Sequence, residues 1–188
     1  MAMKTNPRII LTGGPCAGKS TLLHALKKQG FCCQEESGRA IIQDQKRIGG
    51  PGLPSVSPLL FAELMLTLDI RGWHQAQNSP TMVFYDRGIP DIAGYLTLVG
   101  ETVPDHLINA IHHFRYASTV ILLPPWRAIY HQDNERKQSW DEAVRTYEAM
   151  VRTYQHYGYQ LYTLPFASVN ARMEQLIDKI RSIKTTEG

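Results

Sequence analysis

The chain has 188 residues, of which 43% are hydrophobic and 20% are charged, and its formal net charge is +3. This composition is typical of one globular domain with a substantial core, the small charge does not indicate a nucleic-acid-binding surface, and no apolar run is long enough to span a membrane. The first residues also lack the apolar core of a signal peptide. We therefore expect residues 1–188 to form a single domain of a cytoplasmic protein, without a membrane or nucleic-acid partner.

The first predicted element is an apolar strand at residues 8–12, which leads into a glycine-rich segment. Gly13–Ser20 fits the pattern G-x-x-x-x-G-K-[ST], and leucines at helical spacing follow it. Strand, glycine loop and helix in this order are the context of a P-loop, whose backbone N–H groups and helix N-terminus bind a polyphosphate. Chance alone would produce the pattern in about one per cent of chains of this length. The sequence therefore predicts a nucleotide-binding loop.

The P-loop pattern assigns a role to each of its polar residues. We expect Lys19 to reach the β- and γ-phosphates as a catalytic residue, and the Ser20 hydroxyl to ligate Mg²⁺. Cys16 lies where a thiolate would be favoured, but we interpret it as a small residue at a variable loop position. The residues expected to contact the nucleotide are Gly13, Gly14, Pro15, Cys16, Ala17, Gly18, Lys19, Ser20 and Thr21.

Helices and apolar strands alternate along the rest of the chain. Further strands are predicted at residues 31–34, 81–85, 118–123 and 159–164. Helices are predicted at residues 19–29, 37–48, 58–77, 89–98, 104–114, 139–157 and 168–184. Continuous apolar strands that alternate with helices indicate one doubly wound α/β domain with a parallel sheet covered on both faces.

Two of the longer helices have apolar residues at helical spacing. In the helix at residues 58–77, the side chains expected to be buried are Phe61, Leu64, Met65 and Leu68, with Trp73 as a further candidate. The helix at residues 139–157 begins with a predicted capping box of Ser139 and Glu142. Its expected buried face consists of Val144, Tyr147, Val151 and Tyr154.

The strand at residues 81–85 ends on Asp86, which Arg87 follows. An acidic residue at the end of such a strand is typical of a Walker B carboxylate, which holds Mg²⁺ or takes the proton of the acceptor. The alternative is an ordinary aspartate that caps the next helix, but the P-loop favours a catalytic role for Asp86. We expect Arg87 to reach the transferred phosphoryl group or the acceptor, whereas Asp91 is a weaker candidate that could act as a cap.

Glu36 and Arg39 follow the second strand, on the rim where open α/β sheets bind ligands. A carboxylate can accept a hydrogen bond from an acceptor hydroxyl, and an arginine can hold a phosphate. We therefore expect both residues, with Arg87, to bind the substrate. The alternative is an i,i+3 ion pair on a helix surface, worth only about 0.2–0.5 kcal/mol.

A polar, charged stretch at residues 126–138 separates the fourth strand from the capped helix. A mobile lid in this place would bring arginines to the phosphates and exclude water as it closes. One such cationic group can raise the rate by ~10³-fold or more. We expect Arg136 to act in catalysis and Arg127 to contact the nucleotide, the alternative being a solvated loop.

Together these segments resemble the small P-loop ATPase and kinase family that includes the ribosylnicotinamide kinase domains of bacterial NAD regulators, a family often described only as an AAA-type ATPase domain. The matching segments are GGPCAGKST at residues 13–21, the E-x-x-R of Glu36 and Arg39, FYDRG at residues 84–88, the D-x-x-R of Asp133 and Arg136, and GYQLYTLP at residues 158–165. The chain is similar, more loosely, to thymidylate and deoxynucleoside kinases.

This resemblance implies a three-layer P-loop NTPase fold with five parallel strands in the order 2-3-1-4-5. It also implies ATP, Mg²⁺ and phosphoryl transfer, but it leaves the acceptor open. Our leading hypothesis is a kinase of a small metabolite, namely a nucleoside, a nucleotide or a ribosyl-cofactor precursor. The alternative is an ATPase switch that hydrolyses nucleotide slowly and controls a protein partner.

Overall fold

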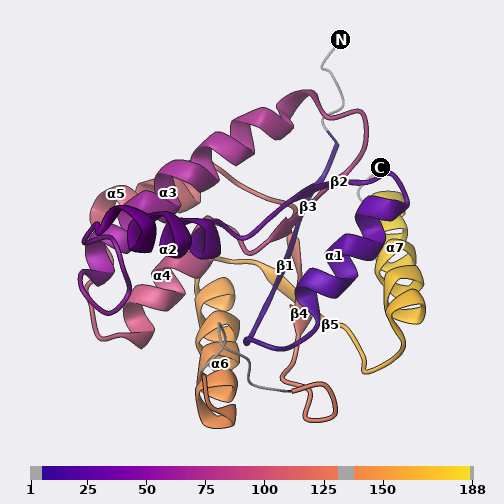
Figure 1. Cartoon of the computed structure of the whole chain (residues 1–188). Coiled ribbons are helices and arrows are strands. Elements are labelled where there is room, and N and C mark those ends of the chain that lie inside the picture. The colour runs from indigo at the N-terminus through magenta and orange to yellow at the C-terminus, as the bar shows by residue number, and fades with distance from the viewer. Residues whose placement is uncertain (1–5, 131–137, 187–188) are drawn as a thin grey trace.

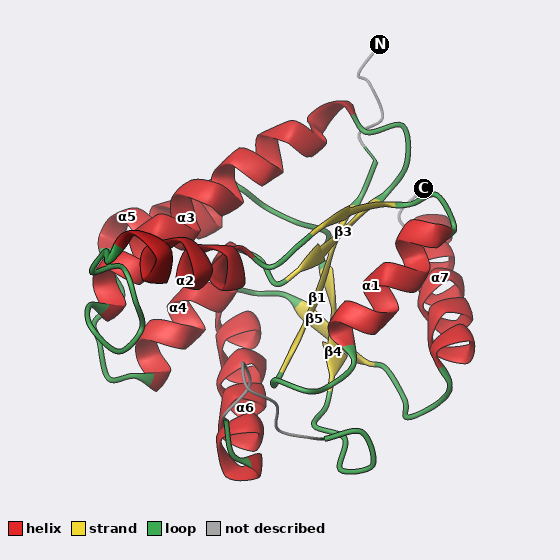
Figure 2. Ribbon diagram, viewed as in Figure 1, coloured by secondary structure: helices red, strands yellow, loops and turns green. Residues whose placement is uncertain are grey.

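A parallel sheet forms the centre of the molecule (Figures 1 and 2). The structure is a computed structural model that describes residues 6–130 and 138–186. Within these residues the strands are β1 (Arg8–Gly13), β2 (Cys32–Gln34), β3 (Val83–Asp86), β4 (Thr119–Leu123) and β5 (Gln160–Thr163). They pair in parallel in the order β2-β3-β1-β4-β5. The predicted sheet order is therefore confirmed.

Helices cover both faces of the sheet, as predicted. They are α1 (Lys19–Lys28), α2 (Ser37–Ile48), α3 (Pro58–Gln75), α4 (Ile89–Leu98), α5 (Asp105–His113), α6 (Trp140–His156) and α7 (Val169–Thr186). Figure 1 shows α1 and α7 together on one side of the sheet, with α2 to α6 on the other side. The described helices include none that is long and apolar enough to cross a membrane.

The three central strands, β1, β3 and β4, read as largely apolar runs because both of their faces are buried. Successive side chains of a strand point to opposite faces of the sheet. Ile10 and Tyr85 accordingly join the core under α4 and α6, whereas Leu11 and Phe84 join the core under α1 and α7. This packing fixes the carboxyl ends of β1 and β3 beside one another, because Leu11 of β1 lies opposite Asp86 of β3.

The predicted buried faces of two helices are partly wrong. In α3, Leu68 is 40% exposed, whereas Phe61, Ala62 and Leu66 are buried. Apolar residues lie all around this helix, so spacing alone does not identify the side that packs against α2 and α4. In α6, the buried side chains are Ala143, Ala149, Met150 and Tyr154, while Val144, Tyr147 and Val151 are only half-buried.

The predicted capping box at the start of α6 is confirmed. The Ser139 N–H donates to the Glu142 carboxylate at 2.5 Å, and the Glu142 N–H donates to the Ser139 hydroxyl at 3.2 Å. These bonds satisfy N–H groups that the first helical turn leaves without a partner. The helix therefore begins at a defined residue directly after the segment at residues 131–137.

Candidate active site

The glycines of the P-loop are required by close backbone packing. At Gly13, with φ 144°, a Cβ atom would lie 2.1 Å from the Leu123 carbonyl oxygen of β4. At Gly14, a Cβ atom would lie 2.4 Å from the Ala143 carbonyl oxygen of α6. Gly18 has a left-handed φ of 83°, and α1 begins at the next residue. The loop therefore passes from β1 to α1 along a path in which side chains at residues 13 and 14 would clash.

Lys19 is buried under this loop, where its ammonium group donates to the Gly14 carbonyl at 2.8 Å. Burial and, to a smaller extent, the nearby positive charge of Arg87 lower the pKa of Lys19 to about 8. The carboxylates of Asp86 and Glu36 oppose this effect only in part. A bound polyphosphate would stabilise the charged ammonium, so the site is poised to bind an anion.

A cavity of about 1020 Å³ opens over the P-loop, and we refer to it as the P-loop cavity. Of the residues predicted to contact the nucleotide, those from Pro15 to Thr21 line it. Glu36 and Arg39, at the start of α2, and Arg87, directly after β3, line the same cavity. The structure thus brings most of the predicted site residues together.

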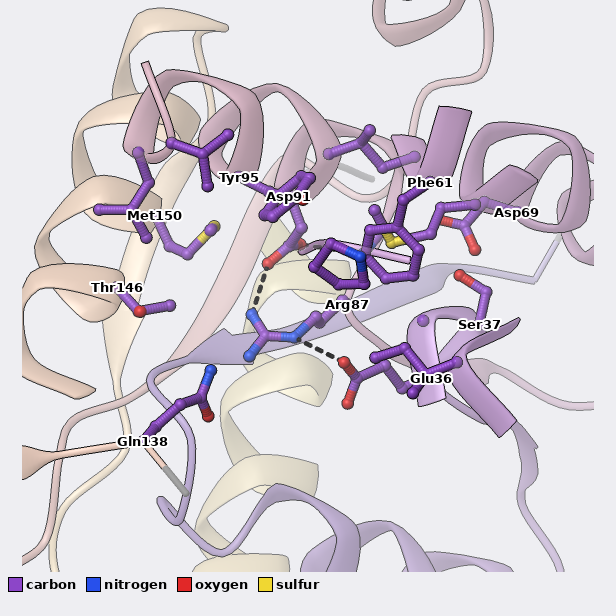
Figure 3. Close-up of a pocket in the computed structure, with 18 of the residues that line it drawn as sticks. Glu36, Ser37, Phe61, Asp69, Arg87, Asp91, Tyr95, Gln138, Thr146 and Met150 are labelled. Carbon is purple, nitrogen blue, oxygen red and sulfur yellow. Dashed lines mark hydrogen bonds and ion pairs between the residues drawn. The ribbon is translucent and has the colours of Figure 1, made fainter. Parts of the chain in front are cut away.

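A second cavity of about 510 Å³ lies between α2, α3, α4 and α6, and we refer to it as the inner cavity (Figure 3). The residues that line both cavities are Glu36, Ile42, Pro54, Arg87, Gln138 and Glu142. The phosphates of a nucleotide in the P-loop cavity and a molecule in the inner cavity would therefore meet at a boundary that includes the ion pair of Glu36 and Arg87.

Arg87 is held in a strained but well-supported position. Its backbone has a left-handed φ of 69°, which costs a non-glycine residue about 1–2 kcal/mol. Its guanidinium lies 3.5 Å from the Glu36 carboxylate and donates to the Asp91 carboxylate at 3.1 Å (Figure 3). Burial acts to lower the pKa of Arg87, but the carboxylates of Glu36, Asp91 and Asp86 outweigh it and raise this pKa. Arg87 is therefore a fixed positive charge.

Asp91 holds Arg87 in place. This buried carboxylate accepts hydrogen bonds from the Gly88 N–H at 2.9 Å and from the hydroxyls of Thr12 and Tyr154. It thus links β1, α4 and α6 around the guanidinium. The sequence suggested a cap for Asp91, and the structure shows the cap together with this larger network.

Asp86 is buried at the end of β3, and its Oδ1 atom has no hydrogen-bond partner among the described residues. Burial raises the pKa of Asp86, although the positive charge of Lys19 opposes this rise. A buried oxygen without a partner can be satisfied by a metal ion or by its bound water. Ser20, in the first turn of α1, faces the P-loop cavity.

These two groups fit the predicted Mg²⁺ site. Mg²⁺ prefers oxygen ligands and usually binds through one or two protein groups, water and substrate phosphates. No cluster of three or more His, Cys, Asp or Glu side chains that could hold a metal occurs in residues 6–130 and 138–186. The Mg²⁺ site at Asp86 and Ser20 stays a prediction.

The two predicted lid arginines have different outcomes. Arg127 is exposed, its guanidinium lies 4.7 Å from the ring centre of Trp140, and it lies outside the lining of the P-loop and inner cavities. Arg136 and the D-x-x-R segment to which it belongs fall at residues 131–137, outside the described residues. The role of each arginine remains a prediction.

Arg172 contacts the P-loop, and sequence reasoning missed it. It is buried on α7, and its guanidinium donates to the Ala17 carbonyl of the P-loop at 3.2 Å. The guanidinium also lies 5.4 Å from the ring centre of Trp126. Both residues line a cavity of about 280 Å³ next to Gly18 and Thr21. No local signal marks Arg172, because its partner is 155 residues away.

Asp69 is a second residue that the sequence analysis missed. It lies on α3, lines the inner cavity and accepts a hydrogen bond from the Ser37 hydroxyl (Figure 3). Burial and, to a smaller extent, the negative charges of Asp91 and Glu36 raise the pKa of Asp69 to about 7, although the hydrogen bond from Ser37 opposes this rise. A carboxylate in a largely apolar helix was the signal that could have drawn attention to it.

Comparisons with known proteins show the family of the chain and its fold. A family model described as an AAA domain matches residues 8–172. No curated protein matches the chain. A structure of deoxyadenosine kinase from M. mycoides, with the products dCMP and dCDP bound, is similar with a TM-score of 0.65 at 17% identity, over 93% of this chain and 99% of that chain.

Two further structures have the same architecture. The NadR protein in complex with NR is similar with a TM-score of 0.67 at 18% identity, over 95% of this chain but only 51% of that chain. Thymidylate kinase from Ehrlichia chaffeensis has a TM-score of 0.64 at 11% identity, over 94% of this chain and 99% of that chain. These similar structures are P-loop kinases, which confirms the fold and the resemblance predicted from the sequence.

Proposed function

Because the chain belongs to the AAA domain family and has the fold of P-loop kinases, we propose that it transfers the γ-phosphoryl group of ATP to a hydroxyl group of a small molecule. The observation that carries this proposal is the junction of the two cavities at Glu36 and Arg87. A nucleotide hydrolase needs only a place for the phosphates and a water molecule. A second cavity of about 510 Å³ beside that place instead suits an organic acceptor.

The donor nucleotide would occupy the P-loop cavity. The backbone N–H groups of the loop and the N-terminus of α1 would bind the β- and γ-phosphates, and the Lys19 ammonium would neutralise their charge. We place the nucleotide base in the smaller cavity next to Gly18 and Thr21, where Trp126 offers an aromatic surface and Arg172 a guanidinium. Mg²⁺, held by Ser20 and Asp86 with the phosphates, would supply further charge neutralisation.

The acceptor would occupy the inner cavity, with its hydroxyl group close to Glu36. The Glu36 side chain is 41% exposed and faces both cavities, whereas Asp86 is buried and lines neither of them. We therefore propose that Glu36 accepts the proton of the acceptor's hydroxyl group and that Asp86 binds the metal. Such a general base contributes about 10²–10⁴-fold to a rate.

Arg87 would stabilise the charge on the transferred phosphoryl group. It lies between the Glu36 and Asp91 carboxylates, which fix its orientation before substrate binds. Because the guanidinium is already oriented, little free energy is needed to reorient it during the reaction. Most of the rate enhancement would therefore come from positioning and electrostatic stabilisation, as is usual in phosphoryl transfer.

The experiment that tests this proposal is a measurement of ADP release from Mg-ATP with candidate acceptors. The acceptors are nucleosides, nucleoside monophosphates and nicotinamide riboside, each added singly. We expect one class to stimulate ADP release by the wild type and by Lys28→Ala, a control at an exposed position of α1. Lys19→Ala should abolish the stimulated release, because it removes the buried ammonium group.

A different result would favour the alternative function. Slow, Lys19-dependent release of ADP that no acceptor stimulates would contradict a kinase and favour a nucleotide-dependent switch. The search would then turn to protein partners. Full activity of Lys19→Ala would contradict the assignment of the P-loop itself.

A further inference from the structure

The inner cavity has walls suited to a flat ring. Its aromatic and methionine side chains are Phe61, Met65, Tyr95 and Met150. The rings of Phe61 and Tyr95 pack edge to face with their centres 5.5 Å apart. The cavity's volume of about 510 Å³ is within the range of small-molecule sites. A planar heteroaromatic group would bury much of its surface against these aromatic and methionine side chains.

The charges that line this cavity disfavour a phosphorylated acceptor. Among the described lining residues, the carboxylates are Glu36, Asp69, Asp91 and Glu142, and the arginines are Arg87 and Arg145. The guanidinium of Arg87 is already paired with Glu36 and Asp91. Arg145 is exposed on α6. A phosphate group on the acceptor would therefore meet more negative than positive charge, which raises the cost of binding it.

Asp69 gives the cavity a hydrogen-bond acceptor at one end. Figure 3 shows Asp69 and Ser37 side by side, on the side of the cavity away from Met150 and Thr146. The carboxylate accepts from the Ser37 hydroxyl, and its two oxygens provide about four acceptor positions, so capacity remains toward the cavity. In the described part of the chain, no arginine or lysine forms an ion pair with Asp69. A ligand N–H group is a suitable partner for this carboxylate.

We propose that Asp69 is the specificity-determining residue of the acceptor site, and that the acceptor is an unphosphorylated nucleoside-type molecule whose ring carries an N–H₂ group. This inference rests on the proposed kinase function. The ring would lie against Phe61, its N–H₂ group would donate to Asp69, and its hydroxyl group would face Glu36. A carbonyl oxygen in place of the N–H₂ group would set two hydrogen-bond acceptors against each other. Such a mismatch inside a buried site strongly disfavours the wrong substrate.

The test compares pairs of acceptors that differ at this group and in whether the adjacent ring nitrogen carries a hydrogen. Cytidine is paired with uridine, and adenosine with inosine, each as the riboside and the 2′-deoxyriboside, and the 5′-monophosphates are measured as well. Assays at pH 8 keep the carboxylate form dominant, because the pKa of Asp69 is raised only to about 7. We expect kcat/KM of the wild type to favour an amino nucleoside over its keto partner by roughly 10–100-fold. We expect the monophosphates to be poorer acceptors than the nucleosides.

The variant Asp69→Leu removes the carboxylate at similar side-chain size. We expect its kcat/KM ratio between amino and keto partners to fall to about one, through a higher KM for the amino nucleoside, while KM for ATP is unchanged. A purely structural role of Asp69 would lower both values equally and leave their ratio intact. Asp178→Leu, at an exposed position of α7, is the matched control and should keep the wild-type ratio.

The outcomes separate this inference from the proposed function. Preferred transfer to a keto nucleoside or to a monophosphate would overturn the inference and leave the kinase in place. An unchanged amino-to-keto ratio in Asp69→Leu would do the same. If no acceptor stimulated ADP release by the wild type, the kinase itself would be contradicted, and the assignment of Asp69 with it.

Discussion

The buried ammonium group of Lys19 should destabilise the folded protein in the absence of nucleotide. Its pKa falls from 10.5 to about 8 on folding, mainly because burial disfavours the charged form. A difference of one in pKa corresponds to about 1.4 kcal/mol, so charged Lys19 costs about 3 kcal/mol at neutral pH. The hydrogen bond from Lys19 to the Gly14 carbonyl offsets about 1 kcal/mol of this cost.

The variant Lys19→Met replaces this charge by an apolar side chain of similar length. We expect the free energy of unfolding to rise by about 2 kcal/mol at pH 7, and Tm by about 4–8 °C. Urea and thermal unfolding, followed by the fluorescence of the three tryptophans, would measure both quantities. Addition of Mg-ATP should raise the Tm of the wild type but not that of Lys19→Met, since the variant lacks the group that neutralises the phosphates.

The pH dependence of this difference follows from the two pKa values. Between about pH 8 and pH 10.5 the unfolded chain binds more protons at Lys19 than the folded chain does, so the stability of the wild type rises with pH relative to the variant. The advantage of Lys19→Met should therefore be complete below about pH 8 and absent near pH 10.5. If Lys19→Met were less stable than the wild type at pH 7, or if its stability advantage persisted unchanged at pH 10, charged Lys19 would not be the source of the destabilisation.

Three further substitutions test separate parts of the structure. Glu36→Gln should lower kcat by ~10²–10⁴-fold with little change in KM for ATP. Glu35→Gln, at the exposed neighbouring position, should have no such effect. Equal kinetics of the two variants would show that Glu36 is not the general base. Asp86→Asn should bind ATP but require more Mg²⁺ and lose phosphoryl transfer. If its activity depended on Mg²⁺ concentration as that of the wild type does, Asp86 would have only a structural role. Ser139→Ala should reduce the free energy of unfolding by ~1 kcal/mol through loss of the α6 cap, and unaltered urea denaturation would contradict this contribution.

The sequence predicts those features that depend on neighbouring residues. The P-loop is specified by its own glycines, because the contacts of Gly13 and Gly14 leave no room for a side chain. The strands are visible because both faces of the sheet are covered, and α6 begins where Ser139 and Glu142 predict. The predicted order 2-3-1-4-5 came from the family resemblance, since spacing alone does not determine which strands are neighbours.

Features that depend on contacts between distant segments were harder to predict. Arg172 reaches Ala17 only because α7 packs against α1. Asp69 belongs to a helix with apolar residues on all sides, so its direction is set by α2 and α4 rather than by its own sequence. The contact of Arg87 with Glu36 likewise requires β2 and β3 to be neighbours in the sheet.

The most direct test of the central claim is to follow the γ-phosphoryl group itself. ATP labelled in this group would be incubated with the protein, Mg²⁺ and each candidate acceptor, and the products would be separated by chromatography. We expect the label to appear in a phosphorylated acceptor with the wild type and not with Lys19→Ala. Label found only as inorganic phosphate, in equal amounts with and without every acceptor, would contradict it.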